Sequence, residues 1–133
     1  MDDRPAVVEL DRGGQSSNFS RVTGLSPDAV ARMIRSLEGE SDITATIRRE
    51  GSDARLLVAV SGTSAFVGLH SSDGIFQYVA HGDQRVGTRL LSVGGHDTRI
   101  KSRYISEVTA AADVVREWLL EGIDASPGAW ERT

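Results

Sequence analysis

The chain has 133 residues, a length that suits one domain burying roughly two-thirds of the surface that its unfolded chain exposes. Hydrophobic residues make up 39%, which is too apolar for a disordered protein, and the net charge of −4 argues against nucleic acid as the main ligand. No apolar run reaches the ~20 residues of a membrane span, and without cysteines neither a disulfide framework nor a cysteine zinc site can form. The first residues lack the pattern of a secretory signal, and we therefore expect a cytoplasmic protein.

The first third of the chain predicts a strand, a loop and a helix. Residues 5–11 alternate enough for a short strand, and the stretch 12–25, rich in Gly, Ser and Asn, predicts a flexible loop. Ser26 then supplies an N-cap, and Pro27 occupies the first helical position. Apolar residues recur after them at helical spacing until Gly39, where we expect the helix to end.

From residue 43 the hydrophobic pattern changes to a period of two, and the next segments, 55–61 and 65–69, are apolar almost throughout, which is typical of strands in the middle of a sheet covered on both faces. With the turns between them, these segments predict a run of antiparallel strands. The predicted strands, separated by turns, are 43–48, 55–61, 65–69, 75–80, 88–93 and 99–105. In the last of them Arg99, Lys101 and Arg103 alternate with Ile100, Ser102 and Tyr104. The three basic side chains would therefore form one outward row. Such a row protects an edge strand from pairing with other chains, and it also suits a negatively charged partner.

The C-terminal segment carries the whole excess of negative charge. Residues 1–105 hold 13 acids and 13 bases, whereas residues 106–133 hold six acids and two arginines. Ser106 predicts the N-cap of a second, acidic helix that ends at Gly122. The remaining segment, 123–133, is predicted to be a tail docked onto the body of the protein by Trp130.

This order of elements predicts a single α+β domain over residues 1–133. We expect an antiparallel meander sheet of about five to six strands with two helices packed on it.

Side chains capable of catalysis form no recognisable site in the sequence. His70, His81 and His96 each lie next to a predicted turn, and no two have the spacing of metal ligands on one helix. The Gly-rich turn at 92–95 leads into a strand, although a phosphate-binding loop would lead into a helix. We therefore predict no catalytic residue, no metal site and no cofactor.

Four short motifs occur in the order Gly94-Gly95, Arg103-Tyr104, Trp118 and Trp130-Glu131. With these motifs, residues 55–133 resemble the first-catalogued (type one) family of immunity proteins of bacterial polymorphic toxin systems. In that family a strand-rich middle runs into a Gly-rich turn, a segment ending in Arg-Tyr, a helix with an aromatic residue near its end and a Trp-Glu pair. The loop 12–25 has no counterpart in this pattern.

The resemblance implies a non-enzymatic inhibitor that binds a cognate protein toxin, often a nucleic-acid deaminase, inside the producing cell. An acidic helix with a Trp-Glu tail could occlude the basic cleft of such a toxin, and complementary charge would speed association. The protein itself would bind neither nucleic acid nor a membrane. The residues expected to contact the toxin are Arg103, Tyr104, Glu117, Trp118, Glu121, Trp130 and Glu131.

Two other functions remain open at this point. The chain could be a small-molecule-binding or enzymatic domain of a biosynthetic pathway, with Tyr78, His81, His96 and Arg103 lining a pocket. It could also be a self-associating module, in which the apolar outer face of strands 55–69 forms a homodimer. A toxin gene adjacent to this one would favour the inhibitor. A deep polar cavity would favour the small-molecule-binding or enzymatic domain, and concentration-dependent association would favour the self-associating module.

Overall fold

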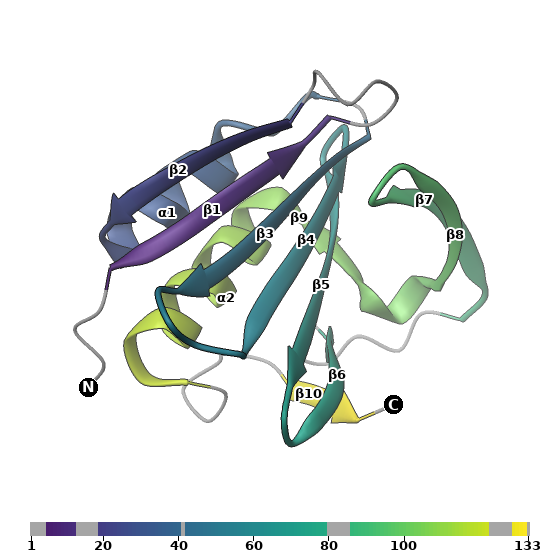
Figure 1. Ribbon diagram of the computed structural model, residues 1–133. Coiled ribbons are helices and arrows are strands. Elements are labelled where there is room, and N and C mark those ends of the chain that lie inside the picture. The colour runs from purple at the N-terminus through teal and green to yellow at the C-terminus, as the bar shows by residue number, and fades with distance from the viewer. Residues whose placement is uncertain (1–4, 13–18, 41, 80–85, 123–128, 133) are drawn as a thin grey trace.

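A computed structural model describes residues 5–12, 19–40, 42–79, 86–122 and 129–132 (Figure 1). The helices in these ranges are α1 (Pro27–Arg35) and α2 (Val108–Glu121), with a short 3-10 turn η2 (Ser102–Tyr104). The strands are β1 (Ala6–Asp11), β2 (Phe19–Leu25), β3 (Ile43–Arg49), β4 (Arg55–Ser61), β5 (Ser64–Ser71), β6 (Gly74–Val79), β7 (Thr88–Val93), β8 (His96–Lys101), β9 (Ile105–Glu107) and β10 (Ala129–Arg132). The predicted α+β class is confirmed.

The main sheet contains eight strands within the described ranges, more than the five to six predicted. Its order is β10-β6-β5-β4-β3-β1-β2, and β9 also pairs with β5. Every neighbouring pair is antiparallel. The strands β3 to β6 form the predicted meander, whereas β1, β2, β9 and β10 join it from distant parts of the chain.

The prediction of a loop over 12–25 is wrong for residues 19–25, which form the edge strand β2. This strand pairs with β1, so that Glu9 lies opposite Arg21 and Val8 opposite Val22. The composition is typical of a loop, but the edge of a sheet needs little hydrophobic patterning when one side of the strand faces solvent. Backbone pairing with β1 is a long-range feature that local composition does not reveal.

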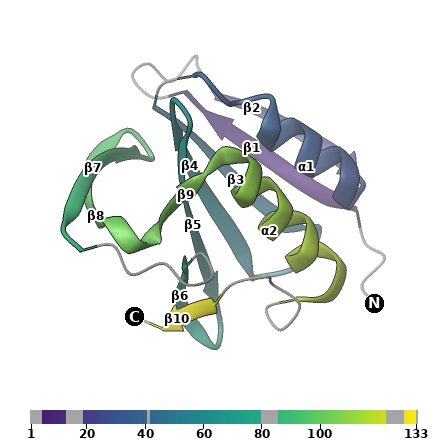
Figure 2. The same cartoon turned by 180° about the vertical axis from the view of Figure 1, so that it is seen from behind.

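Both helices lie side by side on one face of the main sheet (Figure 2). The start of α1 agrees with prediction, because the hydroxyl of Ser26 accepts a 3.1 Å hydrogen bond from the amide of Ala29. The main core lies between this helical layer and the sheet. It is built from the alternate residues of the strands that face the helices, among them Val8, Ile47 and Val58, each fully buried.

The second helix starts one residue later than predicted, with Glu107 at the N-cap position in place of Ser106. Ser106 belongs to β9 instead, and its hydroxyl lies 3.5 Å from the carbonyl oxygen of Ala65 on β5. The other end of α2 is held by Arg49, a buried arginine of β3 whose guanidinium donates to the carbonyl oxygen of Leu119. A cation at this end satisfies a free helical carbonyl and opposes the negative end of the helix dipole.

The strands β7 and β8 form a separate two-stranded sheet, so the prediction that they continue the meander is wrong. The predicted strand 99–105 ends at Lys101 and is followed by η2 and β9. The reason lies at the edge of β5, where β6 pairs with residues 68–71 and β9 pairs with residues 64–66. These two short strands divide the edge of β5, and β7 pairs with β8 in the second sheet.

The β7–β8 hairpin packs one of its faces on the side of the sheet away from the helices. A second, smaller core forms there from Ala59, Phe66, Leu91, Ile100 and Ile105. Two residues of this core, Ala59 and Phe66, belong to the outer face of strands 55–69 that was considered for a homodimer. Their side chains are therefore buried within the chain itself.

Gly94 and Gly95 connect the two strands of the hairpin. Val93 and His96 are cross-strand partners, so the loop between them has two residues, and both have positive φ angles of 60° and 85°. This is the backbone of a tight hairpin turn that matches the twist of the strands, and glycine adopts it without the steric cost of a side chain. The amide of Gly94 also donates a 2.9 Å hydrogen bond to the hydroxyl of Thr44, which ties the turn to β3.

Candidate protein-binding surface

The seven residues predicted to contact a partner come from three elements. Arg103 and Tyr104 lie in η2, three residues lie on α2, and the last two lie on β10. The three on α2 are Glu117, Trp118 and Glu121. The fold brings the η2 residues and β10 together through direct side-chain contacts.

Arg103, Tyr104 and Glu131 form a cluster that we name the clasp. The hydroxyl of Tyr104 donates a 3.0 Å hydrogen bond to Oε1 of Glu131, and Nη2 of Arg103 forms an ion pair with Oε2 of the same carboxylate. The guanidinium of Arg103 also lies 5.6 Å from the centroid of the Tyr104 ring. Each oxygen of Glu131 therefore has its own partner, and the carboxylate that was expected to face a toxin is neutralised within the chain.

The clasp is half buried. The side chains of Arg103 and Glu131 are 40% and 35% exposed. Nε of Arg103 is buried and has no hydrogen-bond partner within the described residues, so the guanidinium does not use all its donors. An ion pair at this depth loses less of its strength to solvent than one on the surface. The clasp thus fastens the described end of the tail to the segment that follows the hairpin.

Trp130 lies on the other side of β10 from Glu131, because successive side chains of a strand point to opposite faces. It pairs across the strands with Tyr78 of β6, and the two rings meet edge to face with centroids 5.5 Å apart. Trp130 and Trp118 are both partly buried and pack against the main core. Both tryptophans therefore contribute to the stability of the fold as well as to the surface.

Burial raises the pKa of Tyr78 above its usual value of 10.0, and the negative charge of Asp113 adds to the effect. The phenol of this residue is 4% exposed and stays neutral under physiological conditions.

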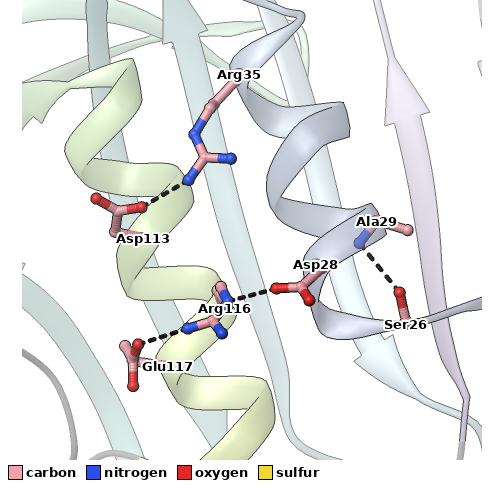
Figure 3. Close-up of polar contacts among 7 residues, drawn as sticks. All are labelled: Ser26, Asp28, Ala29, Arg35, Asp113, Arg116 and Glu117. Atoms are coloured by element: carbon pink, nitrogen blue, oxygen red, sulfur yellow. Dashed lines mark hydrogen bonds and ion pairs between the residues drawn. The ribbon is translucent and has the colours of Figure 1, made fainter.

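Three acidic side chains on the helical layer are held by arginines of the same chain (Figure 3). Asp113 of α2 lies 2.8 Å from Nη2 of Arg35 on α1, and Asp28 of α1 lies 2.5 Å from Nε of Arg116 on α2. Glu117 lies 2.9 Å from Nη1 of Arg116, which therefore serves two carboxylates. The local negative field that the sequence predicted for α2 is thus reduced.

The ion pair between Asp28 and Arg116 changes the ionisation of both groups. The hydrogen bond from Arg116, and then its charge, lower the pKa of Asp28 below the usual 3.8, and the carboxylate in turn raises the pKa of Arg116. Of the acidic residues predicted to contact a partner, Glu121 alone is exposed and has no ion-pair partner among the described residues.

The residues considered for a ligand pocket lie in separate environments. Tyr78 belongs to the main core, Arg103 to the clasp, and His96 is exposed at the start of β8. His81 lies outside the described residues. Within the described ranges, no group of three His, Asp or Glu side chains has the proximity of metal ligands.

The hairpin presents a surface that the sequence indicated only as a basic row. Arg99 and Lys101 are exposed on β8, and Leu90 is exposed on the neighbouring strand. The sequence signal was the alternation of basic residues in 99–103, but Arg103 leaves the row because the strand ends at Lys101.

A scan against models of known protein families and a search of curated proteins find no match to this chain. The resemblance to the immunity proteins therefore depends on the four motifs quoted above. Neither helix within the described ranges is long and apolar enough to span a membrane.

Proposed function

We propose that this chain is a non-enzymatic immunity protein that binds and neutralises a cognate toxin of a polymorphic toxin system. The observation that carries the proposal is the clasp. Two of the motifs behind the resemblance, Arg103-Tyr104 and Trp130-Glu131, meet side chain to side chain although Tyr104 and Glu131 are 27 residues apart. Motifs that matched by chance would have no reason to contact one another.

The other two motifs also have defined places in the fold, which further supports the proposal. Gly94-Gly95 forms the hairpin turn, and Trp118, like Trp130, is partly buried and packs against the main core. The four motifs thus lie in the hairpin, η2, α2 and β10, at positions where they contribute to the fold. We expect such structural positions to be retained in a family whose binding surfaces vary with the toxin.

Neutralisation in this proposal depends on rigid docking. The paired helices, the tied hairpin and the fastened tail offer a surface that is already ordered before binding, so that little conformational entropy is lost on association. The toxin that the resemblance implies is a nucleic-acid deaminase, blocked in the cytoplasm of the producing cell. Fast association is favoured where the two proteins carry complementary charges.

The test uses the gene adjacent to the one that encodes this chain. If that gene encodes a toxin, its toxic domain is expressed in a bacterial host with and without the present protein, and growth is compared. We expect growth to be rescued and the two purified proteins to form a one-to-one complex in size-exclusion chromatography with light scattering. A neighbouring toxin that neither binds nor is neutralised, or a neighbourhood without a toxin gene, would contradict the proposal.

A further inference from the structure

The outer face of the β7–β8 hairpin exposes both apolar and basic side chains to solvent. Leu91 and Ile100 point into the second core, so the residues that alternate with them point away from it. The outward pairs, whose two members lie directly opposite each other, are Thr88 with Lys101, Leu90 with Arg99 and Ser92 with Asp97. We name the outward residues of these pairs, among them Leu90, Asp97, Arg99 and Lys101, the hairpin outer face. Val86 lies just before β7 in the chain.

The exposed apolar side chains are Leu90 on this face and Val86, which precedes β7 in the chain. Leu90 is 59% exposed and Val86 is 91% exposed. Among the described residues, the only other large hydrophobic side chain with comparable exposure is Ile75, on a different strand. Single exposed hydrophobic residues are normal on protein surfaces, but two of three lie within five residues of each other here.

The two cations of this face outnumber its one carboxylate, Asp97, and are available to a partner. Neither Arg99 nor Lys101 has a carboxylate within ion-pair distance among the described residues, and Arg99 instead donates a 3.0 Å hydrogen bond to the hydroxyl of Thr88. This bond directs the guanidinium toward Thr88, which lies on the same face as Leu90. By contrast, Glu117 and Glu131, which were expected to meet a partner, are already paired with arginines of the chain.

From these observations we infer that the hairpin outer face is the docking surface for the partner protein, which offers carboxylates around an apolar centre. The inference rests on the proposed function, because it names the surface that contacts the toxin. An apolar centre with a charged rim is the usual composition of a protein interface. The cations of the rim specify an acidic partner by charge complementarity.

A nucleic acid fits this surface less well. Neutralising several phosphates requires a broad basic footprint, whereas the chain as a whole has a net charge of −4. The exposed Leu90 and Val86 also have no counterpart on a phosphate backbone. The geometry points to an acidic patch on the toxin domain, outside any basic cleft that binds its own substrate.

The experiment measures binding of the toxin domain from the adjacent gene to the full-length protein by isothermal titration calorimetry. The variants are Arg99→Glu and Leu90→Ser. The control for Arg99→Glu is Arg55→Glu, because Arg55 is also an exposed arginine in a strand, β4. The control for Leu90→Ser is Ile75→Ser, because Ile75 is an exposed hydrophobic residue of β6. Thermal unfolding of each variant verifies that the fold is intact before affinities are compared.

We expect Arg99→Glu and Leu90→Ser each to weaken binding by about tenfold or more, and both controls to change it by less than about threefold. The loss from Arg99→Glu should shrink between about 50 mM and about 300 mM NaCl, because salt screens the exposed charges. If the wild type binds and the hairpin variants bind equally well, the inference is wrong while the proposed function stands. If the wild type itself does not bind, the proposed function fails first.

Two further arms separate the alternatives. Glu121→Lys tests the exposed acid of α2, and a loss of affinity in this variant alone would move the docking surface to the helix and overturn the inference. A fluorescent single-stranded oligonucleotide tests for nucleic acid. Binding of that probe that disappears in Arg99→Glu, with toxin binding unchanged, would also overturn it.

Discussion

Tyr104 donates a 3.0 Å hydrogen bond to the carboxylate of Glu131, and this contact joins the segment after the hairpin to the last strand of the sheet. Without it, β10 would be held by its backbone pairing with β6, by the packing of Trp130 and by the ion pair between Glu131 and Arg103. A strand of four residues at the edge of a sheet has few contacts, and a side-chain tie therefore has a large relative effect on its stability.

Replacing Tyr104 by Phe tests this tie. The change removes one hydroxyl and keeps the ring, so we expect the free energy of unfolding to fall by about 1 kcal/mol. Amide hydrogen exchange at residues 129–132 should accelerate more than in the helices. Glu121→Gln, on the exposed side of α2, serves as the control and should leave both readings unchanged.

Replacing Trp130 by Ala tests whether this residue docks the tail. Loss of its ring exposes the side chain of Tyr78 to solvent. Because Trp130 is partly buried, we expect the free energy of unfolding to fall by about 2 to 3 kcal/mol. The pKa of Tyr78, raised by burial, should fall back toward 10.0 as the phenol becomes hydrated.

Absorbance of the phenolate measures this titration. The chain has two tyrosines, so in a Tyr104→Phe background the signal reports Tyr78 alone. A raised pKa in the folded state means that stability is fully present below pH 10 and declines as the pH rises through the folded pKa. This alkaline decline should be weaker after Trp130→Ala, and an unchanged titration would show that Trp130 does not cover Tyr78.

The neighbours Leu90 and Leu91 test the orientation of the hairpin. Leu91 is 4% exposed in the second core, whereas Leu90 is 59% exposed. We expect Leu91→Ala to cost about 2 to 4 kcal/mol, because it leaves a cavity, and Leu90→Ala to change stability by less than about 0.5 kcal/mol. Urea denaturation of the two variants compares them directly, and equal losses would mean that the hairpin does not pack as described.

The ion pair between Asp28 and Arg116 predicts a dependence of stability on pH. The pKa of Asp28 is lowered in the folded state, so its contribution is present above the unfolded value of 3.8 and is lost as the pH falls through the lower, folded value. The stability difference between wild type and Asp28→Asn should therefore be constant above about pH 5 and shrink in more acidic solution. Denaturation with urea at a series of pH values measures this stability difference.

A control for this experiment is Asp53→Asn, which removes the same charge at an exposed turn between β3 and β4. That carboxylate has no ion pair among the described residues. If both variants give the same pH profile, the ion pair between Asp28 and Arg116 is not the cause of the pH dependence of stability.

The sequence by itself determined the elements whose signals are local. Ser26 and Pro27 mark the start of α1 because capping depends only on residues within one turn. The strand β3 follows from a period of two, β4 and β5 follow from nearly continuous apolar segments, and turns separate the consecutive strands β3 to β6. The α+β class follows from this order of elements. The two-residue turn at Gly94-Gly95 also depends only on its own backbone.

Only the tertiary structure decided the features that depend on distant partners. The polar strand β2 exists because β1 offers it an edge, and the hairpin leaves the main sheet because β6 and β9 divide the edge of β5. The same holds for charge. From the sequence, the acids of 106–133 predict an exposed negative surface. In the fold, Arg35 and Arg103 neutralise two of these acids. Such ion pairs form between side chains that are distant in the sequence and that only folding brings together.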